Sequence, residues 1–144
     1  SGRMRAVRFH DVHHVLTGYR PTWRGECEIA SWELASGMAS FWTGFAIDAG
    51  AFLLGLVLCP VRSFRAWVRG RRSGNRYRGV RAWSDAILDE RVDDLRARLH
   101  VAGDDERATP IDALTYVALA AALLVPPIVV AALVLAFAYA RVTG

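Results

Sequence analysis

The sequence contains no lysine and no glutamine, so each of its 18 basic side chains is an arginine. Its two cysteines, Cys27 and Cys59, are too few for a disulfide framework and form no CxxC pair, so we expect both to be reduced and structural. No segment of useful length alternates apolar and polar residues, which argues against a sheet. Charged residues make up only 22% and hydrophobic residues 53%, a balance that excludes disorder for most of the chain. The 144 residues therefore suit one helical domain and are too few for a two-domain cofactor enzyme.

The order of the segments predicts an all-α protein. The first residues, SGRMRAVRFH, are basic and lack the apolar core of a signal peptide, so none is expected. The apolar spacing predicts helices over 7–18 and 26–42, an apolar run over 45–59, a short basic helix over 61–69, and an acidic amphipathic helix from about 83 to 103. We expect a helical domain over 1–103, a linker over 104–110 and a membrane segment over 111–141.

The membrane segment is the clearest physical signal in the chain. Residues 113–140 carry no charge, and a helix of ~20 apolar residues is long enough to cross the hydrocarbon core. Thr109 is the expected N-cap, Pro110 the first helical residue, and Asp112 lies near the positive end of the helix dipole. Pro126 and Pro127 interrupt the middle, which membrane helices tolerate. A hairpin dipping into one leaflet and a buried helix of a soluble bundle remain alternatives.

Four potential metal ligands lie close together near the N-terminus. His10 and His14 are one helical turn apart, and Asp11 lies three residues before His14, so one helix face can offer two imidazoles and a carboxylate. Glu26 opens the next helix and can fold back onto that face. This set suits Zn²⁺, Fe²⁺, Mn²⁺ or Co²⁺ rather than Ca²⁺, with a coordination position left open. The alternative is a polar helix face on which histidines pair with acids.

The spacing from His10-Asp11 through His14 to Glu26 (HDxxH followed by eleven residues and E) resembles the Coq-four family of ubiquinone (coenzyme Q) biosynthesis. The segment HHVLTGYRPTWRGE, the PVR after the apolar run, the GRR at 70–72 and the DDLRARLHV at 93–101 are similar to segments of that family. The resemblance covers roughly residues 6–101. The helices that usually precede the motif in the family are missing here, and 113–140 lies beyond its usual end.

The resemblance implies a helical fold at the inner membrane and a divalent metal, usually Zn²⁺. Carried over by position, the ligands are His10, Asp11, His14 and Glu26. His13 occupies a variable family position and faces solvent or supports the ligands by hydrogen bonds. Glu33 falls where the family tends to have an acid, and it is the other candidate for such support.

The resemblance also implies a prenylated quinone precursor and other ubiquinone biosynthesis enzymes as partners. The expected reaction is metal-dependent oxidative decarboxylation of a polyprenylated 4-hydroxybenzoate-type ring. The metal cation, Arg20 or Arg24 is expected to bind the carboxylate of that ring. The alternative is a non-catalytic lipid-binding scaffold that organises the biosynthetic complex. Asp48, the acid within the apolar run, either pairs in the core or faces the site.

Eight arginines lie between Arg62 and Arg81 with no acid among them. Because the following segment is acidic and the chain ends in a membrane segment, we expect anionic lipid headgroups as the partner and no nucleic acid. Arginines before the apolar segment favour the cytoplasmic face of a bacterial inner membrane, or the matrix face of the mitochondrial inner membrane. We also expect a homo-oligomer.

Overall fold

The computed structural model describes residues 2–38, 42–77 and 84–143. It contains α1 (Gly2–Thr17), α2 (Trp23–Ser36), α3 (Trp42–Leu58), α4 (Pro60–Arg71), a 3-10 helix η2 (Asp85–Asp89), α5 (Val92–Arg98) and α6 (Pro110–Thr143). No strand occurs within these described ranges. The predicted all-α class is confirmed.

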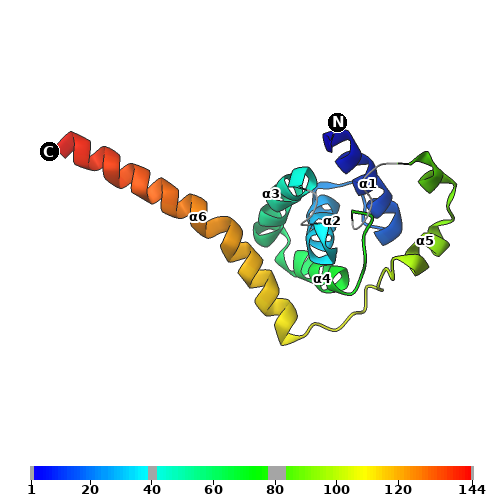
Figure 1. The fold of residues 1–144 in the computed structure, drawn as a ribbon. Coiled ribbons are helices and arrows are strands. Elements are labelled where there is room, and N and C mark those ends of the chain that lie inside the picture. Colours follow the sequence, from blue (N-terminus) through cyan, green and yellow to red (C-terminus); the bar gives the residue numbers. More distant parts are fainter. Residues whose placement is uncertain (1, 39–41, 78–83, 144) are drawn as a thin grey trace.

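Helix α2 lies at the centre of the domain, with α1, α3 and α4 around it (Figure 1). Ile29 and Trp32 of α2 and Ala66 of α4 are buried together where these two helices pack. A Cβ at Gly70 would lie 2.5 Å from the Trp32 carbonyl oxygen, so only glycine allows the end of α4 to approach α2 this closely. The core is thereby built around the helix that carries both Glu26 and Glu33.

Helix α2 begins and ends earlier than the predicted 26–42. Thr22 has extended backbone angles and its hydroxyl accepts a hydrogen bond from the Gly25 amide, which makes Thr22 the N-cap. Gly37 adopts a left-handed conformation (φ 111°), and its amide bonds the Glu33 carbonyl, which ends the helix. The remainder of the predicted helix over 39–41 lies outside the described residues.

The prediction of a single amphipathic helix from 83 to 103 is wrong. The described part is broken into η2 and α5 at Glu90 and Arg91, which are both extended. Leu95 is buried, but Leu88 of the expected apolar stripe is 68% exposed. Arg96 donates hydrogen bonds to the carbonyls at the end of α1, and these tertiary contacts orient α5 independently of η2. The expected start near Trp83 lies outside the described residues.

Helix α6 is one continuous helix that begins at Pro110 as predicted, with Pro126 and Pro127 inside it. It is not a hairpin. Its first third packs on the domain as far as Leu123, and the rest extends away from the domain (Figure 1). The most apolar 18-residue stretch within residues 110–142 has a mean hydropathy of 2.7, and none of it is buried. The helix is therefore long and apolar enough to cross a membrane, and it is not the buried helix of a soluble bundle.

The start of α6 is fixed to the domain by Asp112, which is 1% exposed. Its carboxylate accepts hydrogen bonds from Arg71 Nε at 2.8 Å and from Arg72 Nη2 at 2.9 Å. One turn later, the Tyr116 hydroxyl donates to Ser63 Oγ of α4 at 2.9 Å. A charged contact and a neutral one thus hold α6 against the last and first turns of α4.

Candidate metal centre

The imidazoles of His10 and His14 meet on one face of α1. Their Nε2 atoms lie 3.1 Å apart. Glu26, in the first turn of α2, places one carboxylate oxygen 3.0 Å from His10 Nε2 and the other 3.3 Å from His14 Nε2. Two ligand atoms at ~2.1 Å from one tetrahedral zinc ion lie ~3.4 Å apart. The three side chains therefore converge at nearly the spacing that a bound metal requires.

The position of Glu26 follows from the residue before it. A Cβ at Gly25 would lie 1.8 Å from the carbonyl oxygen of Arg20, so glycine lets the loop cross directly over the first turn of α2. Thr22 caps that turn, and the Glu26 amide bonds the Thr22 carbonyl. The tight loop turns the first α2 carboxylate towards the histidine face of α1.

Each of the two histidines is oriented by a hydrogen bond from its other ring nitrogen. His10 Nδ1 lies 3.2 Å from a carboxylate oxygen of Glu33, which is fully buried. His14 Nδ1 donates to the backbone carbonyl of Tyr19 at 2.9 Å. When each ring holds its proton on Nδ1 alone, as metal binding requires, both Nε2 lone pairs are directed at the common point near Glu26. This arrangement is the usual support of metal-binding histidines by carboxylates and carbonyls.

His13 belongs to the support of the site and is fully buried rather than facing solvent. Its Nε2 accepts a hydrogen bond from the Arg76 amide at 2.9 Å, so the ring proton is on Nδ1. Nδ1 lies 2.5 Å from the second carboxylate oxygen of Glu33 and donates to it. Glu33 thus accepts from His10 with one oxygen and from His13 with the other.

The electrostatics of the group centre on Glu33. Burial acts to raise the pKa of Glu33, but hydrogen bonds from His10 and His13 outweigh it and hold the pKa well below its usual range. Burial acts to lower the pKa of His10, but hydrogen bonds and charges from Glu33 and Glu26 raise it to about 9. Without a metal, both ring nitrogens of His10 therefore carry a proton at neutral pH, and the ring is positively charged.

Asp48 of α3 faces the site, which settles the open question of its surroundings. It is 3% exposed and lines a small cavity of about 100 Å³ together with His10, Glu26 and Tyr77. Burial and the neighbouring charge of Glu33 raise the pKa of Asp48 far above its usual range, so this carboxyl is protonated at neutral pH. Its Oδ2 atom has no hydrogen-bond partner among the described residues.

His10, Glu33 and Asp48 also form a second group whose ligand atoms lie within 4.8 Å of one another. His10 belongs to both groups through its two ring nitrogens, and His13 already forms a hydrogen bond with Glu33. We therefore interpret Glu33 and Asp48 as residues that orient His10, not as a second metal site. The sequence predicts Glu33 at this site, leaves two possibilities for Asp48, and gives no indication that Tyr77 lies beside it. A lone acid within an apolar run was the signal for Asp48.

The other residues named from the sequence lie away from the convergence point. Asp11 is exposed on α1 and is not part of either group of converging ligand atoms. Arg20 and Arg24 are exposed in the α1–α2 loop and at the start of α2, and neither lines the cavity beside His10. The Arg24 guanidinium lies 4.9 Å from the centre of the Trp23 ring. Metal binding by Asp11 and carboxylate binding by these arginines remain predictions.

The arrangement of donors fits a divalent transition metal. Two imidazole nitrogens and one carboxylate are the ligands of sites that keep a fourth position open for water or substrate. The adjoining cavity, with the neutral Asp48 carboxyl on its wall, lies beside that position. Comparison with family models, with curated proteins and with solved structures found no match to this chain.

Proposed function

We propose that the chain is a membrane-anchored metalloprotein that binds one divalent ion, with Zn²⁺ the best fit and Fe²⁺, Mn²⁺ and Co²⁺ as alternatives. The observation that carries this proposal is the convergence of His10 Nε2, His14 Nε2 and Glu26 within 3.0–3.3 Å of one another. Two imidazoles and a carboxylate at this spacing match the donor set of sites for divalent transition metals.

Elemental analysis of the purified protein tests the metal site. We expect about one metal ion per chain, and its loss in His14→Ala and in Glu26→Gln. His100→Ala is the matched control, because His100 is exposed and lies outside the site. Equal metal content in the wild type and both site variants would refute the proposal.

The anchor in this proposal is α6, with the metal domain on the cytoplasmic side in a bacterium. The arginines of α4 precede the apolar helix and Arg141 follows it, which fits the positive-inside rule. Resistance of the full chain to alkaline extraction from membranes would support insertion. Protease digestion of the domain in inverted vesicles, but not in right-side-out vesicles, would support the orientation.

For the chemistry, we propose metal-dependent oxidative decarboxylation of a polyprenylated 4-hydroxybenzoate-type ring, as the resemblance to the Coq-four family implies. The carboxylate leaves as CO₂ and a hydroxyl takes its place on the same carbon. This is a two-electron oxidation, balanced by the reduction of one dioxygen to hydrogen peroxide with one water consumed. A bound divalent ion supplies Lewis-acid stabilisation of developing negative charge. Glu33 keeps His10 oriented, and the protonated Asp48, which is hydrogen-bonded to Glu33, forms part of the cavity wall.

Complementation of a ubiquinone-deficient strain tests this chemistry. Glu26→Gln is expected to accumulate a prenylated ring that still carries its carboxylate, as measured by mass spectrometry. Normal ubiquinone in that strain would contradict the enzymatic proposal.

A non-catalytic lipid-binding scaffold is the second candidate, and the cavity size favours it. The space beside His10 is about 100 Å³, whereas ligand pockets usually measure ~300–1,000 Å³. Loss of partner enzymes from the biosynthetic complex, with no specific carboxylated intermediate, would favour the scaffold.

A further inference from the structure

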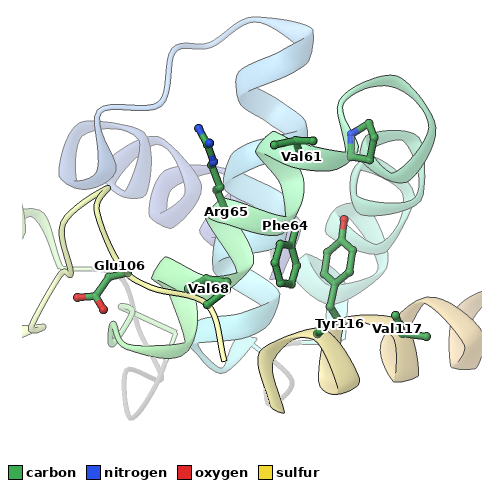
Figure 2. Close-up of a pocket in the computed structure, with 10 residues that line it drawn as sticks. Val61, Phe64, Arg65, Val68, Glu106, Tyr116 and Val117 are labelled. Atoms are coloured by element: carbon green, nitrogen blue, oxygen red, sulfur yellow. The ribbon is translucent and has the colours of Figure 1, made fainter. Parts of the chain in front are cut away.

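A second, larger pocket lies far from the metal ligands, between α4 and the first two turns of α6. Its volume is about 610 Å³, within the range of small-molecule sites. Figure 2 shows Phe64 of α4 beside Tyr116 of α6, and the two rings are in edge-to-face contact with their centroids 5.3 Å apart. Val61, Val68 and Val117 also line the pocket. The wall is apolar apart from its rim, and the pocket shares no lining residue with the cavity at His10.

The position of this pocket along α6 places it at the level of the lipid headgroups. The domain covers α6 as far as Leu123, and each of the nineteen residues over 124–142 is exposed. Nineteen helical residues span ~28 Å, close to the ~30 Å thickness of a hydrocarbon core. If the bare segment fills the hydrocarbon, the pocket at Ala113 and Val117 lies just outside it. This step rests on the membrane insertion of α6 proposed above.

The rim of the pocket carries an available positive charge. Arg65 is exposed and forms no hydrogen bond or ion pair with any residue that the structure describes. It also lines a neighbouring polar hollow of about 280 Å³ with Arg62 and Arg69. Arg69 is occupied by Asp104 at 2.9 Å, whereas Arg62 has only a long contact of 3.7 Å with Glu28.

The acid on the opposite rim does not cancel this charge. Glu106 lies 3.0 Å from Arg72 Nε and is paired with it. An apolar hollow therefore adjoins a polar one that is lined by three arginines and two acids, Glu28 and Asp104. Arg65 at their border is the arginine that pairs with no acid among the described residues. Guanidinium groups bind phosphate strongly, since their N–H donors match its oxygens.

We propose that the α4–α6 pocket binds one anionic glycerophospholipid of the adjacent leaflet, with an acyl chain against the apolar wall formed by Val61, Phe64 and Val117 and the phosphate on Arg65 and Arg62. The charge complementarity, the apolar wall and the headgroup-level position together determine this occupant. The bound lipid fills the space between the domain and the start of its anchor.

Native mass spectrometry of the full chain, released from nanodiscs of equal phosphatidylglycerol and phosphatidylcholine, tests the proposal. The wild type is expected to retain one phosphatidylglycerol in preference to phosphatidylcholine. Arg65→Ala is expected to reduce this preference about fivefold, the effect of one arginine near an anionic surface. Ala113→Trp fills the pocket from an exposed position on α6 and is expected to abolish retention of either lipid.

Arg91→Ala is the matched control, because it removes an exposed arginine distant from α4 and should retain lipid as the wild type does. Circular dichroism must show unchanged helicity in each variant. Equal retention of the two lipids by the wild type, or unchanged retention in Arg65→Ala and Ala113→Trp, would overturn the proposal. So would a prenylated ring or a second copy of the chain at this pocket. Failure to enter nanodiscs would refute the anchor itself, and the metal analysis is independent of both.

Discussion

Glu33 is the residue on which the geometry of the candidate metal centre depends most. It is fully buried, it accepts from His10 and His13 with its two oxygens, and Asp48 lies beside it. An ionised carboxylate in this position keeps the His10 proton on Nδ1 and leaves Nε2 for a ligand. Its backbone carbonyl also accepts from the Asn75 side chain, which ties α2 to the segment after α4.

We expect Glu33→Gln to weaken metal affinity by ~10–100-fold, the usual effect of removing such a support. The neutral amide cannot accept from both histidines with two equivalent oxygens, so the His10 ring loses its fixed orientation. Isothermal titration with Zn²⁺ measures the change. Glu28→Gln, on the same helix but directed at Arg62, is the control and should bind as the wild type does. Unchanged affinity in Glu33→Gln would show that His10 is oriented by other contacts.

The raised pKa of His10 predicts how the metal-free protein responds to pH. Glu33, Glu26 and His14 face this ring, and the two glutamates raise its pKa from 6.5 to about 9. The stabilisation is complete below pH ~6.5 and is lost as pH rises through ~9, because only the protonated ring interacts with both carboxylates. We expect the free energy of unfolding of the metal-free protein to fall by up to about 3 kcal/mol over this range.

Chemical denaturation in detergent at pH 6.5 and 9.5 measures this effect. A His10→Asn variant should show a smaller fall over this range, whereas the contribution of the buried, protonated Asp48, which also lowers stability as pH rises, should remain. The Zn²⁺ affinity of the wild type should change in the opposite direction and rise with pH, because the ion must displace the His10 proton. A metal-free protein that becomes more stable on going from pH 6.5 to 9.5 would contradict the assignment.

At the scale of elements, the loop between α1 and α2 determines whether the ligands meet. The loop crosses the first turn of α2 at Gly25, where the Arg20 carbonyl occupies the place of a side chain. The histidines belong to α1 and Glu26 to α2, so a displacement of this crossing separates them.

We expect Gly25→Ala to destabilise the domain by about 2 kcal/mol and to weaken metal binding at least tenfold, since the new methyl group forces the backbone apart. Thermal unfolding and Zn²⁺ titration measure the two effects. Gly50→Ala in α3 is the control, because a Cβ there meets nothing within 4 Å. That variant should be neutral or more stable by up to ~1 kcal/mol, owing to the helix preference of alanine. Wild-type metal affinity in Gly25→Ala would show that the loop adapts.

For the whole molecule, the important junction is between the domain and α6. Asp112 is buried against Arg71 and Arg72, while Tyr116, Ser63 and Ser31 form a chain of hydroxyl contacts from α6 through α4 to α2. The orientation of the domain relative to α6 therefore depends on these polar contacts within two turns of α6, together with the apolar packing around Tyr116.

We expect Asp112→Ala to reduce the free energy that holds the start of α6 on the domain by about 3 kcal/mol, because Arg71 and Arg72 lose a buried partner. Hydrogen exchange should accelerate in the first turns of α6 and the last turn of α4, whereas the metal content stays unchanged. Glu106→Ala removes a more exposed partner of Arg72 and should have a much smaller effect. Equal exchange rates in Asp112→Ala and the wild type would show that apolar packing alone holds α6.

The sequence by itself determined the features that depend on neighbouring residues. Helical spacing placed His10 and His14 on one face, and the Thr109–Pro110 start of α6 follows from capping preferences. The length and apolar character of α6 are likewise properties of a continuous segment. Such features were predictable because a single helix satisfies its own backbone and presents its side chains at fixed intervals.

Only the tertiary structure decided which distant side chains meet. Asp48 reaches Glu33 and the cavity because α3 packs on α2, and Asp11 remains exposed because α1 turns its two histidines towards Glu26. The break at Glu90 and the α4–α6 pocket also arise from contacts between segments far apart in the chain. Periodicity reports which face of a helix is apolar, but the partner of that face is chosen by packing and by the pairing of buried charges, which involve the whole chain.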